Sequence, residues 1–448
     1  MTFTPLTIDE FGRQLRAGKT SASEAVEECL RRIAADTARL NAFILVMADE
    51  ARRAAKIADE ELAAGQDRGP LHGVPISVKD LFDIKGTPTT AASRVREGHV
   101  ATTDAHAIAH LRQAGAVFIG KTNLHEFAFG TTNEDSAFGP VLNPHDVTRS
   151  PGGSSGGSAV SVVTGMALGT LGTDTGGSIR IPAAACGIVG LKPTYGEISA
   201  EGVVPLSRTL DHVGPLAQTV TGAWHIYRAL AGRPASRPLA PVPVNGLQLA
   251  VPRRYFCDVL DDEVRGTFEA ALDALRRAGA RIVDVDIAHA SVISPVYLPI
   301  SFGDAAAYHA ATLETMPERY TTPVRQRLEI ARYVLAEDYV RALDGREALR
   351  REVDAALLGH DALVLPTLPI PAPPIGATSM QVGASQQPVR AMMLRLTQLF
   401  NLTGHPAVSL PCGATRAGLP VGLQLAGVRM QTDALMRIAL AVERTISS

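Results

Sequence analysis

One stretch of the sequence limits what this chain can fold into more than any other. In residues 149–193, glycine and serine crowd around a run of apolar side chains. A flexible Gly/Ser linker has no apolar stripe to bury. This stretch does have one, made of Val160, Val162, Val163, Met166, Leu168 and Leu171. The mixture predicts two glycine-rich loops joined by a short buried helix. Because glycine tolerates positive φ, such loops can turn several backbone N–H groups toward one ligand.

The second predicted loop has the composition that acyl transfer requires. Thr175, Gly176 and Gly177 lie immediately before Ser178. A tetrahedral intermediate carries a developing oxyanion, which preorganised backbone N–H groups stabilise. Residues 175–177 are therefore a candidate oxyanion hole, and Ser178 is the candidate nucleophile. A glycine-rich loop can instead bind phosphate, but the GxxxxGK[ST] pattern of a P-loop is absent from the sequence.

A serine nucleophile needs a base, and one lysine is placed unusually well for that role. Lys79 directly follows an apolar run in the segment GVPISVKD. Burial penalises an ammonium, so a lysine in such a place loses its charge and can accept a proton. No histidine has a comparable setting; those available are His72, His125, His212 and His405. Because Lys79 and Ser178 are far apart in the chain, spacing alone does not bring them together.

The remaining sequence alternates strand-like and helix-like segments. Residues 7–65 are predicted to be helical, with a capping signal at Ser21 and Glu24. An apolar run at 74–78, a helical stretch at 105–114 and a second apolar run at 116–120 predict a βαβ unit and an α/β core. Further strand-like runs lie at 247–251, 281–287, 362–366 and 407–411, and further helical stretches at 261–278, 327–359 and 388–402.

Length alone suggests two to three domains, although single α/β layers of this size occur. The proline-rich segment 232–246 is predicted to be a surface connection between an N-terminal and a C-terminal half. Strand-like runs on both sides of it can join one sheet. We therefore expect a single domain over residues 1–448, with a helical N-terminal region at 1–65 and a core at 70–220 that contains the Gly/Ser-rich stretch.

Charge and cysteine usage exclude several classes of protein. Lys and Arg number 43 and Asp and Glu number 45, a balance that gives no electrostatic reason to expect nucleic acid or an anionic membrane as partner. The four cysteines form no metal-binding or disulfide pattern, and Cys186 is expected to be a buried structural thiol. The N-terminus lacks the features of a secretory signal, and no uncharged apolar run reaches about 18 residues. We expect a cytoplasmic protein without a membrane span or a bound metal.

Several segments together resemble the amidase-signature family. They are LHGVPISVKD (71–80), SPGGSSGGS (150–158), GTDTGGSIRIPAAACGIVGLKP (172–193), TYGEIS (194–199), LDHVGPLAQT (210–219), DALVLPT (361–367) and NLTGHPAVSLPCG with GLPVGLQLAG (401–427). A lone GGSSGGS is weak evidence, whereas the lysine and the serines in this order and context are specific. The resemblance covers nearly the whole chain and is densest at residues 70–220. It implies an α/β fold with a mixed central β-sheet covered by helices on both faces.

The resemblance assigns a catalytic triad. In that family the nucleophile is the serine of GGSIR, here Ser178, and the base is the lysine of VKD, here Lys79. The first serine of GGSSGG, here Ser154, follows a cis peptide and relays the proton. Neutral Lys79 would draw a proton through Ser154 while Ser178 attacks an amide carbonyl. No metal or organic cofactor is implied.

Other residues are assigned supporting roles. Ser155 is expected either to help hold Lys79 or simply to pack. Asp174 and Arg180 are expected to brace the loops. Arg346 precedes DALVLPT, where the family often carries an arginine. It is expected either to pair with a substrate carboxylate or to form a structural ion pair.

The resemblance also places a wall of the substrate site at residues 125–133, HEFAFGTTN. The candidate substrate contacts within this segment are His125, Phe129, Gly130 and Thr131. For His125 and Phe129, a position in the core is the alternative.

The identity of the substrate is the remaining question. The family hydrolyses aliphatic and aromatic amides, ureas, malonamate-like acids and fatty amides. It also includes the glutaminase subunit of the tRNA-dependent amidotransferase, in which an acidic residue shortly before the NLAGLP segment holds the glutamine amino group. Here Leu394 stands at about that position, with no carboxylate nearby. Because an uncompensated ammonium in an apolar site is costly, we expect an amidase of a small-molecule carboxamide or urea-type amide.

Two alternatives stay open. The first is the glutaminase subunit itself. The second is a catalytically inactive binding or assembly subunit; the presence of all three triad residues argues against it. A homodimer or a small partner subunit is compatible with either kind of enzyme.

Overall fold

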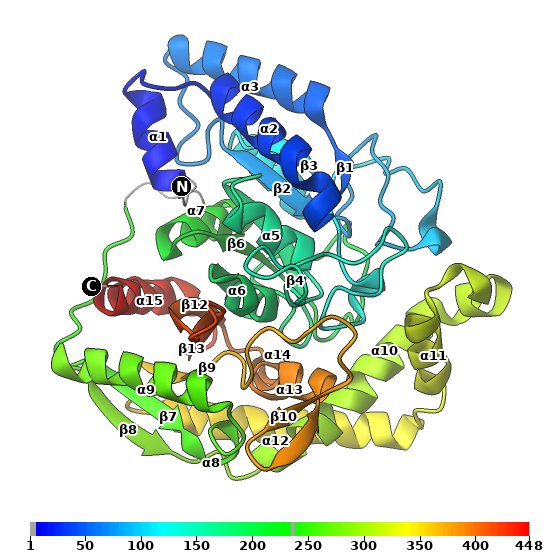
Figure 1. Ribbon diagram of the computed structural model, residues 1–448, viewed down its shortest axis with the longest axis vertical. Helices are drawn as coiled ribbons and strands as arrows, with labels where there is room; N and C mark the ends of the chain where they lie inside the picture. Colours follow the sequence, from blue (N-terminus) through cyan, green and yellow to red (C-terminus); the bar gives the residue numbers. More distant parts are fainter. Residues whose placement is uncertain (1–5, 234–237, 448) are drawn as a thin grey trace.

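The computed structural model describes residues 6–233 and 238–447. Within them, eleven strands form one sheet (Figure 1). Their order is β1 (Phe43–Val46), β3 (Val117–Thr122), β2 (Pro75–Lys79), β4 (Gly169–Asp174), β6 (His212–Ala217), β5 (Val189–Lys192), β12 (Ala407–Ala414), β13 (Pro420–Ala426), β9 (Ala362–Pro366), β7 (Gln248–Pro252) and β8 (Arg281–Val285). The sheet is mixed, because β2 runs parallel to β3 and β4 while β4 runs antiparallel to β6.

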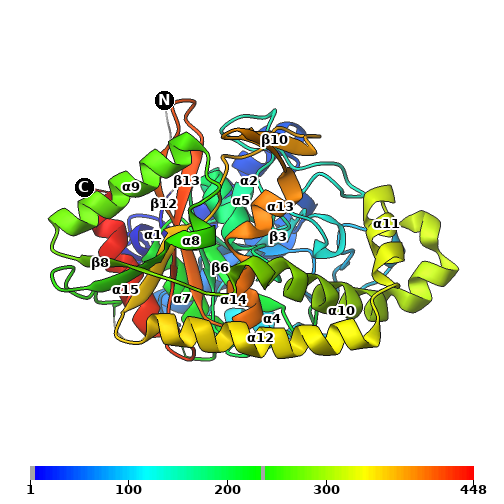
Figure 2. The same ribbon diagram turned by 90° about the horizontal axis from the view of Figure 1, so that it is seen from below.

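Helices cover both faces of this sheet (Figures 1 and 2), which confirms the predicted fold class. Their bounds are α1 Ile8–Arg16, α2 Ala22–Leu40, α3 Ala48–Ala63, α4 His106–Gln113, α5 Gly156–Val163, α6 Arg180–Cys186, α7 Val220–Leu230, α8 Arg253–Phe256, α9 Asp262–Arg277, α10 Ile293–Thr315, α11 Thr322–Ala331, α12 Ala336–Leu357, α13 Val389–Arg395, α14 Gln398–Thr403 and α15 Thr432–Ile446. A separate hairpin is formed by β10 (Ser379–Val382) and β11 (Ser385–Pro388).

The βαβ unit lies where the sequence predicts it. Strand β2, helix α4 and strand β3 follow in order, and the two strands pair in parallel. The N-terminal region also begins its second helix at the predicted cap. Ser21 and Glu24 form reciprocal side-chain-to-backbone hydrogen bonds at the start of α2. This region is not wholly helical, however, because β1 lies within it.

The C-terminal half departs more from the prediction. The single helical stretch expected at 327–359 is two helices, α11 and α12, with a break at 332–335. The sequence does not predict the long helix α10 before them, since its apolar residues are spread around the helix and Pro299 lies inside it. Helices α10, α11 and α12 project at one end of the molecule (Figures 1 and 2).

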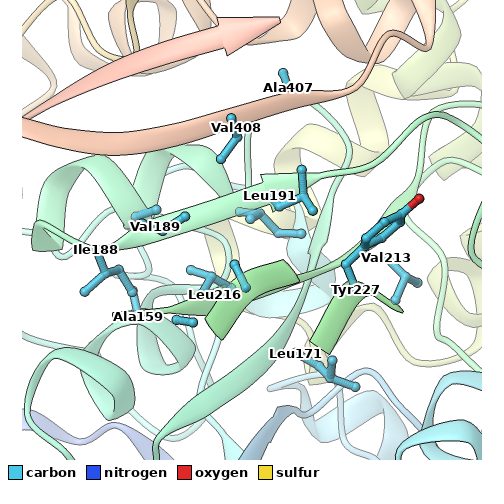
Figure 3. Close-up of a cluster of buried hydrophobic side chains, with 14 of the residues drawn as sticks. Ala159, Leu171, Ile188, Val189, Leu191, Val213, Leu216, Tyr227, Ala407 and Val408 are labelled. Atoms are coloured by element: carbon cyan, nitrogen blue, oxygen red, sulfur yellow. The ribbon is translucent and has the colours of Figure 1, made fainter. Parts of the chain in front are cut away.

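The hydrophobic core is continuous across the two halves of the chain. Strand β12 pairs with β5, so that Val408 lies opposite Leu191. Figure 3 shows these two side chains within a buried cluster that also contains Leu171 of β4 and Leu216 of β6. Of the proline-rich segment 232–246, residues 234–237 lie outside the described residues. No helix in the described part of the chain is long and apolar enough to cross a membrane.

Candidate active site

Two neighbouring strands bring the candidate base and nucleophile to one edge of the sheet. Strands β2 and β4 pair in parallel, with Val78 opposite Leu171. Lys79 is the last residue of β2, and Ser178 lies in the loop that follows β4. The carboxyl ends of parallel strands lie at the same edge of a sheet. This pairing therefore brings Lys79 and Ser178 close in space although they are far apart in the sequence.

Lys79 is completely buried and has two hydroxyl partners. Its Nζ lies 2.8 Å from the Oγ of Ser154 and 2.8 Å from the Oγ1 of Thr173. Burial lowers the pKa of Lys79 from 10.5 to about 7, against the opposing effect of Asp211 and Asp174. Near neutral pH the amine is therefore available in its uncharged form.

Ser154 and Ser178 lie on adjoining segments. The peptide bond between Gly153 and Ser154 is cis, as the resemblance implies. The backbone N–H of Ser155 donates to the carbonyl oxygen of Ser178 at 3.3 Å, which ties the first glycine-rich loop to the second. Ser178 keeps 6% of its surface exposed, whereas Ser154 is fully buried.

Ser155 is not placed to hold Lys79. Its Oγ donates to the backbone carbonyl of Thr173 at 3.3 Å. Among the hydrogen bonds of the described residues, Lys79 takes the hydroxyl of Thr173, rather than that of Ser155, as its second partner. Ser155 therefore fixes the spacing between the first loop and strand β4.

In the loop 175–178, the carbonyl oxygen of Gly176 accepts a hydrogen bond, whereas the backbone N–H groups of residues 176–178 have no partner among the described residues. Thr397 donates from Oγ1 to the carbonyl oxygen of Gly176 at 2.5 Å, and Thr175 donates from Oγ1 to Asp211 at 2.5 Å. Gly177 has a φ of +138°, which only glycine adopts without strain. Within the described chain, the N–H groups of residues 176–178 donate to no other residue. This is the arrangement that a candidate oxyanion hole needs.

Asp174 and Arg180 form a buried ion pair beneath this loop. The guanidinium contacts both carboxylate oxygens of Asp174, at 2.8 and 3.0 Å. Its other N–H groups donate to the Thr397 carbonyl, Gln424 and Asn401. The same carboxylate accepts from the backbone N–H of Ile179, so the pair braces the loop as expected from its sequence context.

The segment 125–133 is almost entirely buried. His125 is buried, its Nε2 lies 3.1 Å from Asp135, and burial lowers its pKa to about 4. A side chain at Gly130 would collide with the His125 ring, so this glycine permits the close packing. Phe129 and Thr131 are nearly buried as well. His125 thus takes the core position that is the alternative to substrate contact.

Arg346 does not reach the loop. Its guanidinium forms a long ion pair with Glu347, at 3.7 Å, and its other charged or polar neighbours include Tyr195 and Tyr339. The structure shows this ion pair, but the Nε of Arg346 is buried without a hydrogen-bond partner among the described residues, so both alternatives for Arg346 stay open. A different arginine, Arg390 of α13, has Tyr297 among its charged or polar neighbours, and Tyr297 packs against Gly176 of the loop.

Sequence reasoning missed several residues that shape the site. They are Thr173, Asp211, Tyr297, Arg390 and Thr397. Asp211 lies inside the LDHVGPLAQT segment that carries the resemblance, where a carboxylate among apolar residues is a signal of a buried role. The others give no signal in sequence, because only the tertiary fold brings them to the loop. The described residues include no group of three or more His, Cys, Asp or Glu side chains suited to hold a metal ion.

Comparisons with known proteins identify the class. The sequence model of the Amidase family matches residues 24–436, so the chain belongs to this family. Its members are hydrolases that act on amide C–N bonds, and the chain is an enzyme of that kind.

The chain is similar over nearly its whole length both to amidotransferase subunits and to a solved amidase. A glutamyl-tRNA(Gln) amidotransferase subunit from Anaeromyxobacter sp. (strain K) is 41% identical over 98% of this chain and 96% of its own length. A crystal structure described as an amidase has 40% identity and a TM-score of 0.93, covering 98% of this chain and 99% of that one. The crystal structure of the corresponding amidotransferase subunit from Thermotoga maritima has 32% identity and a TM-score of 0.79, covering 98% and 94%.

Proposed function

We propose that the chain hydrolyses a small-molecule carboxamide, or a urea-type amide, through an acyl-enzyme on Ser178. The observation that carries the proposal is the fully buried Lys79, whose Nζ contacts the Oγ of Ser154 at 2.8 Å and no carboxylate among the described residues. An ammonium at this depth needs a carboxylate, as Lys121 has in Asp80, or carbonyl acceptors, as Lys192 has, to offset its lost hydration. A base that must be neutral does not.

The mechanism follows from this arrangement. Neutral Lys79 accepts the proton of the Ser154 hydroxyl while Ser154 accepts the proton of Ser178, and the Ser178 oxygen attacks the amide carbonyl. The N–H groups of residues 175–178 face the oxyanion that forms. As the C–N bond breaks, the proton returns by the same relay to the leaving nitrogen. Water then attacks the acyl-enzyme, and the acid is released.

Leu394 supports a substrate without an amino group. A Cβ at Gly176 would lie 3.0 Å from the Cδ2 of Leu394, which places this apolar side chain against the candidate oxyanion loop. An α-ammonium at this place would lack a carboxylate partner and would lose its hydration. The high structural similarity to the solved amidase is consistent with this assignment.

The second candidate is the glutaminase subunit of an amidotransferase. The curated relatives favour it, because two proteins named as subunits of glutamyl-tRNA(Gln) amidotransferase match nearly the whole chain at 41% and 35% identity. In that case the chain would release ammonia from glutamine for a partner subunit. The chemistry at Ser178 is the same for both candidates, so only the acyl donor separates them.

The test is ammonia or amine release from a panel of primary amides, anilides, ureas and glutamine, measured for the wild type and for Ser178→Ala. Turnover of simple amides that the alanine variant abolishes supports the first candidate. Turnover of glutamine alone supports the second and removes the argument from Leu394. An absence of turnover together with an absence of fluorophosphonate labelling at Ser178 would refute both and favour a non-catalytic subunit.

A further inference from the structure

Arg390 is a positive charge that forms no direct ion pair with a carboxylate of the described residues, and Asp135 is the one carboxylate among its charged neighbours. It is partly buried in α13, and its guanidinium carbon lies 5.7 Å from the centre of the Phe129 ring. Among the described residues, it forms no hydrogen bond and no ion pair. Burial lowers its pKa to about 10, so the guanidinium is charged at neutral pH. An unpaired guanidinium in such a place is costly unless a ligand supplies the anion.

Two side chains, Leu394 and Tyr297, relate the position of Arg390 to the oxyanion loop. Arg390 and Leu394 are four residues apart on α13, and therefore lie on the same face of that helix, about 6 Å apart along its axis. A Cβ added at Gly176 would lie 3.0 Å from the Cδ2 of Leu394 and 2.6 Å from the hydroxyl of Tyr297. Both side chains therefore pack against the oxyanion loop. Tyr297 also interacts electrostatically with Arg390. Arg390 therefore lies one helical turn along α13 from a residue that packs against the oxyanion loop.

The charges around Arg390 do not balance. Arg327 is the other arginine beside Phe129, and its Nη1 donates to the Phe129 carbonyl at 2.5 Å. Its Nη2 lies 3.7 Å from Asp135, the one carboxylate among the charged neighbours of Arg390 in the described chain. His125 is neutral because burial lowers its pKa to about 4. Asp135 therefore offsets Arg327, and one positive charge remains.

We propose that Arg390 binds a carboxylate at the far end of the acyl group, so that the substrate is a short amide with an anionic acyl half. The guanidinium fork suits a carboxylate because two parallel N–H groups can donate to its two oxygens. Because Arg390 is one helical turn from Leu394, which packs against Gly176, we take the acyl chain to be a few carbons long. This inference rests on the proposed function, since it names the class of acyl group that Ser178 would receive.

Three matched amides isolate the two charges that matter. Pentanamide has no charge, glutaramate adds a carboxylate at the end of the same chain, and glutamine adds an ammonium beside that carboxylate. Succinamate and malonamate test shorter chains. We would measure kcat/KM for each with the wild type, Arg390→Met and Arg390→Lys. Arg395→Met is the matched control, because Arg395 lies on the same helix but packs on the Tyr255 ring instead.

We expect the wild type to prefer the best carboxylate-bearing amide over its uncharged counterpart by about 100-fold, the scale of one buried charged hydrogen-bonded pair. Arg390→Met should remove this preference, leaving pentanamide turnover within about threefold, and Arg390→Lys should restore part of it. Arg395→Met should behave as the wild type. Turnover of glutamine equal to that of glutaramate, with both lost in Arg390→Met, would still support the carboxylate contact.

Two further measurements separate this inference from the proposed function. Fluorophosphonate labelling measures the reactivity of Ser178 in every variant. Because the probe is neutral and carries no carboxylate, its reaction does not depend on Arg390. Calorimetric binding of succinate and glutarate reports the Arg390 contact without turnover. The inference is overturned if Ser178 is labelled but anionic and neutral amides are hydrolysed equally, or if Arg390→Met binds the dicarboxylates as the wild type does. If Ser178 of the wild type is not labelled but succinate and glutarate still bind, the proposed function alone is overturned.

Discussion

Replacing Lys79 by methionine tests the candidate base most directly. The structure places its pKa at about 7 instead of 10.5. At pH 7 about half of the side chains are then neutral, whereas at a pKa of 10.5 only about one in three thousand would be. Burial therefore raises the population of usable base by roughly three orders of magnitude. Methionine keeps most of the apolar volume and removes the amine, so we expect the rate of Ser178 acylation to fall by about 10²–10⁴-fold.

The assay is the second-order rate of Ser178 labelling by a neutral fluorophosphonate between pH 5 and pH 10. Because only the neutral amine accepts a proton, the wild-type rate should rise with pH, reach half of its maximum near pH 7 and then level off. Lys79→Met should be slow and lose this step, while Lys85→Met, at an exposed lysine, should match the wild type. A wild-type midpoint near pH 10, or an unchanged pH profile in Lys79→Met, would refute the reasoning.

Three further predictions concern the surroundings of the triad and the fold. Thr173→Val removes one of the two hydroxyls that accept from the Lys79 ammonium, so the labelling midpoint should move to lower pH; a shift to higher pH would contradict this role. Arg180→Met leaves Asp174 buried and unpaired, and urea unfolding at pH 7 should show a loss of about 3–5 kcal/mol. Burial raises the pKa of Asp174 and Arg180 lowers it below the ordinary 3.8, so Asp174 of the variant should take up a proton at a higher pH than in the wild type. The stability difference should therefore shrink as the pH falls, and a difference that grows in acid would be inconsistent with the pair. Ser21→Ala removes the cap of α2 and should cost about 1 kcal/mol in thermal unfolding without altering Ser178 labelling; an unchanged stability would show that the cap is dispensable.

The part of the site that sequence can predict is the part that local pattern determines. Lys79 follows a buried strand, and Ser178 ends a glycine-rich loop, so both are recognisable from their neighbours in the chain. The second partner of Lys79 is not: the sequence suggests Ser155, but the register between β2 and β4 presents Thr173. Such a register is a tertiary property, and no periodicity in either strand reports it.

The C-terminal half is harder to predict for a related reason. Arg346 and Arg390 both lie on helices, and the family resemblance singles out only Arg346, either as a partner for a substrate carboxylate or as part of a structural ion pair. The packing of α12 leaves Arg346 beside Glu347, whereas α13 places Arg390 over the Phe129 ring with Tyr297 among its neighbours. Helix α10, which supplies Tyr297, lacks the amphipathic stripe by which a helix is recognised.

The residues assigned to catalysis and those proposed to contact the acyl group come from different parts of the chain, which affects how such an enzyme can change its specificity. The groups assigned to bond breaking come from residues 79–178, while Tyr297, Arg327 and Arg390 come from later segments of the chain. If Arg390 selects the acyl group as proposed, mutations or recombination confined to the later segments would change the acyl preference while Lys79, Ser154 and Ser178 are retained. For protein engineering, transplanting residues 290–395 between homologues is accordingly a more economical route to a new specificity than altering the glycine-rich loops.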